Sequence, residues 1–135
     1  MISKHITLEE ATFSATATRL KIDNTPPADV LFEMKLIAST CFEPLREWYG
    51  KPIRINSFYR SPFLNKAVGG SKTSQHVFGQ AIDMTAGSKI ENKKLFDWCK
   101  NNLDWDQLIN EYDFSWVHIS YNRAGDNRKQ ILIVK

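Results

Sequence analysis

Cysteine is scarce in this 135-residue sequence, and no apolar run approaches the length of a transmembrane helix. The only cysteines, Cys41 and Cys99, lie far apart without CxxC spacing, which excludes a cysteine zinc knuckle. We expect both to be buried free thiols. No repeat, low-complexity tract or linker interrupts the chain. These absences predict a single domain, residues 1–135, whose core needs no disulfide.

A large charge excess of either sign is also lacking. The formal net charge is +3, which suits a protein that works near an anionic polymer such as bacterial cell wall or nucleic acid. The charge is too small to choose between the two. No apolar run follows Met1–His5, so no signal peptide is predicted. We therefore expect synthesis as a soluble cytoplasmic protein that needs another agent to deliver it to any external substrate.

The apolar pattern predicts helices early in the chain and strands late. Thr7 and Glu10 have the spacing of a capping box. Apolar residues at intervals of three and four predict a helix over 28–49, with a break or kink at Pro44. A second helix is expected over 90–101. Strands are predicted over 52–57, 81–84, 106–112, 115–121 and 130–134. Short connections between the late strands favour antiparallel pairing and an α+β class.

The segment from Ser74 to Asp83 is the most informative part of the sequence. It places His76 and Asp83 seven residues apart, and Gly79 between them allows the chain to turn back. His118 follows 35 residues after Asp83. Two histidines and one carboxylate, with a fourth position left to water, are the ligand count of a catalytic zinc site. The other common zinc signature, HExxH, is absent.

Strand alternation supports a common site for these residues. Ala81 and Asp83 point to one side of their strand, and Trp116, His118 and Ser120 share one side of theirs. Asp83 and His118 on neighbouring strands would converge on one ion, with His76 approaching from the loop. Spacing alone also fits the ordinary alternative of structural histidines and a solvated aspartate.

Ser74-x-His76-x-x-Gly79-x-Ala81-x-Asp83, followed by Trp116-x-His118, resembles the zinc peptidases of the D-alanyl-D-alanine carboxypeptidase family. Residues 55–65 are similar to that family's Ser-x-Tyr-Arg-Ser segment, and residues 43–46 to its small single-domain branch in phages and prophages. The resemblance implies the Hedgehog/DD-peptidase fold, an α+β fold in which helices pack on an antiparallel sheet. It also implies a Zn2+ site on the sheet, with His76, Asp83 and His118 as ligands.

The resemblance further implies that Arg60 reaches the site. A guanidinium there can pair with a peptide carboxylate or stabilise the oxyanion formed during hydrolysis. Many relatives carry the general base, a glutamate, three residues before the last histidine, and this chain has Ser115 there. The nearest carboxylates are Glu111, which we prefer as the base, and Asp113, which also suits an ordinary turn.

Four other residues are candidates for binding substrate or supporting the metal ligands. Ser74, Gln75 and Ser120 could hydrogen-bond ligands or substrate. Trp116 could line the substrate groove, although a core aromatic explains it equally well.

The function implied is that of a hydrolase: an endolysin-like zinc metallopeptidase that cuts peptidoglycan stem peptides. It would act as a carboxypeptidase that removes a terminal D-Ala or as an endopeptidase. The alternative is a zinc-containing wall-binding module of the same fold that has lost turnover. A small basic nucleic-acid binder is disfavoured because acidic residues are interspersed with the basic ones. We expect a monomer without a nucleic-acid partner and without membrane insertion.

Overall fold

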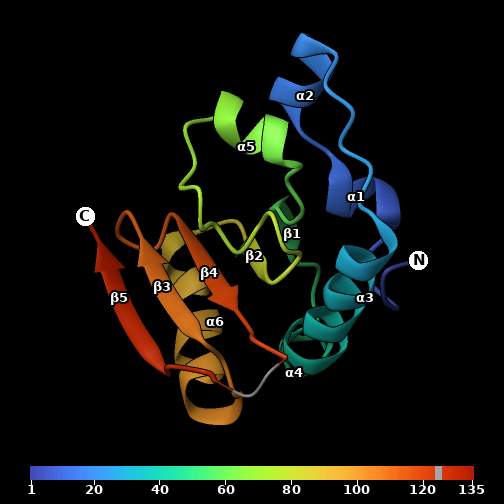
Figure 1. Cartoon of the computed structure of the whole chain (residues 1–135). Coiled ribbons are helices and arrows are strands. Elements are labelled where there is room, and N and C mark those ends of the chain that lie inside the picture. The colour runs from blue at the N-terminus through green and yellow to red at the C-terminus, as the bar shows by residue number, and fades with distance from the viewer. Residues whose placement is uncertain (124–125) are drawn as a thin grey trace.

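The chain folds into a five-stranded sheet with helices packed against it (Figure 1). A computed structural model describes residues 1–123 and 126–135. The helices are α1 (Leu8–Thr12), α2 (Ala15–Leu20), α3 (Ala28–Ile37), η1 (Ala38–Phe42), α4 (Glu43–Tyr49), α5 (Pro62–Ala67) and α6 (Lys89–Asn102). The strands are β1 (Arg54–Ser57), β2 (Ala81–Thr85), β3 (Gln107–Glu111), β4 (Trp116–Ser120) and β5 (Gln130–Val134). The α+β class predicted from the sequence is confirmed.

The sheet has the strand order β1-β2-β4-β3-β5 and is mixed. Pairs β1/β2, β2/β4 and β3/β4 are antiparallel, as predicted. The prediction of a wholly antiparallel sheet is wrong for β5, which pairs parallel to β3, with Gln107 opposite Gln130. A tight hairpin would have reversed the chain after β4. Instead, the connection after β4 leads past β3 to the outer edge, where Gln130 N donates to the Asp106 carbonyl over 3.0 Å.

The predicted break at Pro44 does not occur. Helix α3 passes through a π-helical segment, η1, directly into α4, and Pro44 lies in the first turn of α4. The wider i→i+5 pattern of a π turn accommodates a residue that cannot donate to the preceding turn. Gly50, with φ +73°, then ends the helix, as expected. The capping box of Thr7 and Glu10 at the start of α1 is confirmed.

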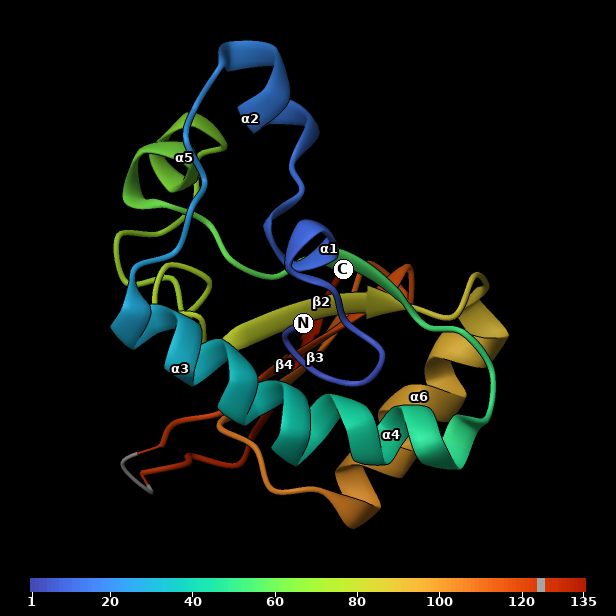
Figure 2. The same ribbon diagram turned by 90° about the vertical axis from the view of Figure 1, so that its right-hand side faces the viewer.

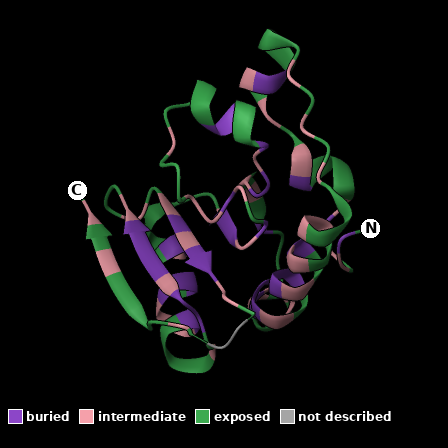
Figure 3. Cartoon of the chain, viewed as in Figure 1, coloured by how far each residue is buried: buried purple, intermediate pink, exposed green. Residues whose placement is uncertain are grey.

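One face of the sheet is built into a single hydrophobic core. Ile82, Met84, Val117 and Ile119 are fully buried, and helices α3, α4 and α6 contribute to the same cluster. Figure 2 shows α4 and α6 side by side beneath the sheet, and Figure 3 shows that buried residues concentrate along β2, β3 and β4. Because side chains alternate along a strand, the opposite face is left to carry polar groups.

Both cysteines are buried and unpaired, which confirms their prediction as free thiols. Burial raises the pKa of the Cys41 thiol to about 12, so it stays protonated and is a poor metal ligand. Within the described residues, no helix is long and apolar enough to cross a bilayer.

Gly79 is required by both its backbone and its surroundings, which gives a testable prediction. Its φ is +70°, and a Cβ there would lie 2.7 Å from Met34 Cγ and 2.8 Å from the Val30 carbonyl oxygen. Gly69 has a similar φ of +75° but open space around it. Gly69→Ala should cost about 1–2 kcal/mol for the left-handed backbone. Gly79→Ala should cost a further ~1–3 kcal/mol for overpacking, measured by urea unfolding. Equal losses would contradict this account.

Candidate metal centre

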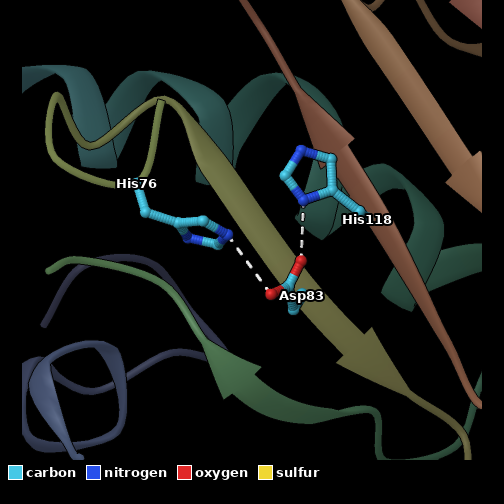
Figure 4. A group of neighbouring side chains, drawn as sticks. All are labelled: His76, Asp83 and His118. Atoms are coloured by element: carbon cyan, nitrogen blue, oxygen red, sulfur yellow. Dashed lines mark hydrogen bonds and ion pairs between the residues drawn. The ribbon is translucent and has the colours of Figure 1, made fainter. Parts of the chain in front are cut away.

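Two neighbouring strands and one loop bring the predicted ligands together. β2 pairs with β4 in a register that places Asp83 directly opposite His118, so both side chains leave the same face of the sheet. His76 lies in the loop before β2, where its carbonyl accepts hydrogen bonds from Arg60 N at 3.2 Å and Gly79 N at 3.3 Å. Figure 4 shows both imidazole rings pointing toward the Asp83 carboxylate.

The donor atoms have the separations that a small metal ion needs. His76 Nε2 lies 3.2 Å from Asp83 Oδ2, and His118 Nδ1 lies 2.7 Å from Asp83 Oδ1. One donor atom from each residue can be chosen so that all lie within 4.8 Å of one another. Tetrahedral zinc bonds of about 2.0–2.1 Å place neighbouring donors about 3.4 Å apart. The three side chains therefore fit a zinc ion with only small movements.

The hydrogen bonding of His76 also suits a metal ligand. Its Nδ1 lies 2.7 Å from the Phe58 carbonyl oxygen. A carbonyl only accepts, so Nδ1 carries the proton and Nε2 faces the other ligands. Metal-bound histidines usually donate their second ring nitrogen in this way, which fixes the tautomer and the ring orientation. His76 is only 4% exposed, so the orientation is held by packing as well.

Asp83 is held in the charged form that binds cations. Burial alone would raise its pKa, but electrostatic interaction with His76 and hydrogen bonding with His118 and His76 outweigh that effect. The net result is a pKa well below the usual range for an aspartate. The carboxylate is therefore ionised at neutral pH and available to a metal.

Arg60 reaches the site, as the resemblance implied. Its Nη2 lies 3.9 Å from Asp83 Oδ2, and its side chain is 21% exposed. Nε donates to Ser57 Oγ at 3.3 Å, and Nη1 donates to Asn65 Oδ1 at 3.2 Å. These two bonds fix the plane of the guanidinium and leave Nη2 directed at the site. Arg60 is thus placed to bind an anion next to a metal.

Comparison with known proteins identifies the family of this chain. The model of the peptidase M15 family matches residues 4–120. The chain belongs to the peptidase M15 family. It is also 46% identical over 39 residues to the zinc D-Ala-D-Ala carboxypeptidase of Streptomyces albus G, a match that covers 29% of this chain and 15% of that protein. The matched segment is therefore a small part of the curated relative.

In this member of the M15 family, Glu111 lies on β3 on the same face of the sheet as His118, whereas Asp113 lies in the turn beyond the strand. Glu111 pairs with Trp116 across the β3–β4 hairpin, two positions along from His118 and on the same face. The residue directly opposite His118 is Ile109. Burial raises the pKa of Glu111 and the Asp83 charge raises it further, whereas His118 and His76 lower it in part. All three candidate ligands therefore influence the charge state of Glu111.

Asp113 and Ser115 belong to the turn between β3 and β4. The Asp113 side chain is 82% exposed and forms an ion pair with Lys89 at 3.4 Å. Ser115 Oγ donates to the Tyr112 carbonyl at 2.7 Å. The structure therefore separates Glu111 from Asp113, the two carboxylates that the sequence left as alternatives for the general base.

The four candidate substrate-binding residues occupy three different environments. Ser74 and Gln75 line a cavity of about 300 Å3 that also reaches His118. Ser120 is fully buried, and its Oγ accepts from Gln107 N at 3.0 Å, so it braces the sheet and is out of reach of a substrate. Trp116 shares the face of His118 and packs on Tyr112 with ring centroids 5.1 Å apart.

Two buried asparagines that support the site were not predicted from the sequence. Asn65 accepts from Arg60 and donates to the Ser71 carbonyl at 2.8 Å, which ties Arg60 to the loop that leads toward His76. Asn92 donates to the Phe114 carbonyl at 2.8 Å, which holds the turn after Glu111. Asn65 ends the segment that resembles the family's arginine motif. Asn92 Oδ1 also accepts from Ala86 N at 2.7 Å, so one side chain joins the end of β2 to the turn between β3 and β4. No sequence pattern marks Asn92, because these partners are backbone groups in two separate segments.

Proposed function

We propose that this chain is a zinc-dependent peptidase of the bacterial cell wall that hydrolyses a peptide bond in peptidoglycan stem peptides. The observation that carries the proposal is the convergence of His76, Asp83 and His118, with Glu111 on the same face of the sheet, two positions along from the residue opposite His118. A permanent ligand set of two histidines and one carboxylate leaves a coordination position open, which is typical of catalytic zinc.

The residues around the centre supply the remaining parts of a hydrolysis mechanism. Zinc, when bound, would supply Lewis-acid polarisation and lower the pKa of water. Glu111 would take the proton from the attacking water and return it to the leaving amine, which suits a carboxylate whose pKa is raised. Arg60 would stabilise negative charge on the substrate, through a carboxylate or through the developing oxyanion.

The substrate class rests on the family and on the named relative. The Streptomyces albus G protein is a zinc D-Ala-D-Ala carboxypeptidase, so a D-amino-acid peptide is the first substrate to test. Removal of a terminal D-Ala and cleavage inside the stem both fit a site of this kind. A phage or prophage role, delivery from the cytoplasm, and the monomeric state stay predictions.

The proposal predicts that the purified protein releases new amino groups or free D-Ala from purified peptidoglycan. Mass spectrometry of the digest would identify the bond. His118→Ala should lower the rate by at least about 10³-fold, because the metal loses one of three protein ligands. Circular dichroism should show that this variant is folded. If the zinc-loaded wild type cleaves no wall substrate, the peptidase proposal fails and a wall-binding module without turnover takes its place.

A further inference from the structure

A second arginine, Arg128, faces the cavity that reaches His118. The other residues that line this cavity are Ser71, Thr73, Ser74, Gln75, Gln107, Ile109 and His118. Most of these side chains carry a hydroxyl or an amide group, and Arg128 provides the one guanidinium in the cavity lining. Neither the resemblance nor the family match, which ends at residue 120, assigns a role to Arg128.

Arg128 is anchored by one edge of its guanidinium. Nε donates to Asp106 Oδ1 at 2.9 Å and Nη2 donates to Asp106 Oδ2 at 2.8 Å. The Arg128 backbone N also donates to Asp106 Oδ1 at 2.8 Å, and the Asp106 side chain is only 4% exposed. Hydrogen bonds from Arg128 lower the pKa of Asp106, so the pair remains charged. The arginine therefore has a fixed direction.

The opposite edge of the guanidinium is free to bind. Arg128 has five N–H donors, and its two side-chain bonds to Asp106 use two of them. Among the described residues, Nη1 has no hydrogen-bond partner, and the side chain is 56% exposed. A guanidinium held along its Nε–Nη2 edge presents the Nη1–Nη2 edge to a carboxylate, which it binds through two parallel hydrogen bonds.

The two arginines lie on opposite sides of β2, the strand that carries Asp83. Arg60 shares a cavity with Asn56 and Ser57 of β1, whereas Arg128 shares its cavity with Gln107 and residues of β3 and β4. Because the sheet order is β1-β2-β4-β3, a peptide crossing the strands at the candidate centre would meet Arg60 at one end and Arg128 at the other.

We propose that the cavity between loop 71–75 and β3 is a substrate subsite in which Arg128 binds a carboxylate of the peptide. The proposal rests on the proposed function and narrows its substrate class to stem peptides with an acidic group on the His118 side of the scissile bond. Arg60 recognises the opposite side. Asp106 is a positioning residue that sets the direction of Arg128.

One series of synthetic stem pentapeptides would test this subsite. One peptide has all its carboxylates free, and the others have a single carboxylate replaced by a carboxamide. Binding is measured by calorimetry on zinc-loaded Glu111→Gln, in which turnover should be strongly reduced. Hydrolysis is measured separately on the wild type. One amidation should weaken binding about tenfold or more, because it removes a charge-assisted pair with arginine.

Arg128→Gln, introduced into the same background, should bind the free peptide as weakly as that amidated peptide and should lose no further affinity when the carboxylate is amidated. Lys129→Gln is the matched control, because Lys129 is a neighbouring cation outside the cavity that pairs with Asp104 at 3.6 Å. Lys129→Gln should still bind the free peptide more tightly than the amidated one. If Arg128→Gln fails to fold because Asp106 is left unpaired, Asp106→Asn with Arg128→Gln removes both charges and should show the same loss.

The outcomes separate this proposal from the function on which it rests. The subsite would be overturned if Glu111→Gln with Arg128 intact bound all the peptides equally. It would also be overturned if the preference for the free peptide over the amidated one survived the removal of Arg128. An Arg128-dependent preference without hydrolysis by the wild type would retain the subsite and overturn the peptidase.

Discussion

Replacing Glu111 with glutamine should lower kcat by about 10²–10⁴-fold while the protein still binds one zinc ion. That range is the usual contribution of a general base. Glutamine keeps the shape of the side chain and removes its capacity to take a proton. Glu111 is not one of the three candidate ligands, so metal content measured by mass spectrometry should be unchanged. Steady-state hydrolysis of a stem peptide would provide kcat and KM.

The matched control is Asp113→Asn, which removes the other carboxylate of the hairpin. Asp113 points into solvent and pairs with Lys89, so this variant should keep kcat within about twofold of the wild type, in line with the small effect of exposed ion pairs. The reverse result, a large loss in Asp113→Asn and none in Glu111→Gln, would show that the base had been assigned to the wrong residue.

Removal of a metal ligand should abolish the stabilisation that zinc gives to the fold. At a free zinc concentration 100-fold above Kd, binding to the native state contributes about 2.7 kcal/mol. For a chain of this size the corresponding rise in Tm is about 10 °C. In His76→Ala the rise should nearly vanish, because His76 provides one of the three donor atoms. Differential scanning calorimetry with and without zinc measures the difference.

His5→Ala provides the control, because His5 is the only histidine outside the candidate centre. His5 Nδ1 lies 2.6 Å from Glu43 Oε1, so this variant should lower Tm in both conditions but keep the zinc-induced rise. A rise of equal size in wild type and His76→Ala would mean that zinc binds elsewhere.

The sequence contains enough information to find the candidate ligands, because each is fixed by local structure. His76 and Asp83 are separated by a loop that Gly79 turns, and His118 lies on a strand with clear alternation. Pairing of the two strands then brings Asp83 and His118 together, since they occur at paired positions. The sheet itself was predictable for the same reason, with the exception of β5, whose direction depends on where the long connection after β4 returns.

The supporting residues were not predictable, because their roles depend on contacts between distant segments. From the sequence, Glu111 and Asp113 were both candidates for the general base. The strand register shows that Glu111 is the one that shares the face of His118. Ser120 has the alternation of a site residue, yet burial and its bond to Gln107 N remove it from the substrate. Asp106 and Arg128 are 22 positions apart, and only the fold brings them together.

The central claim is that hydrolysis of wall peptides depends on zinc held by His76, Asp83 and His118. The most direct measurement is a titration of metal-free protein with zinc while the release of new amino groups from purified peptidoglycan is followed. Hydrolysis should be absent without metal, rise in proportion to added zinc and level off at one ion per chain. Full hydrolysis by the metal-free protein, or one tightly bound zinc without any hydrolysis, would contradict the account.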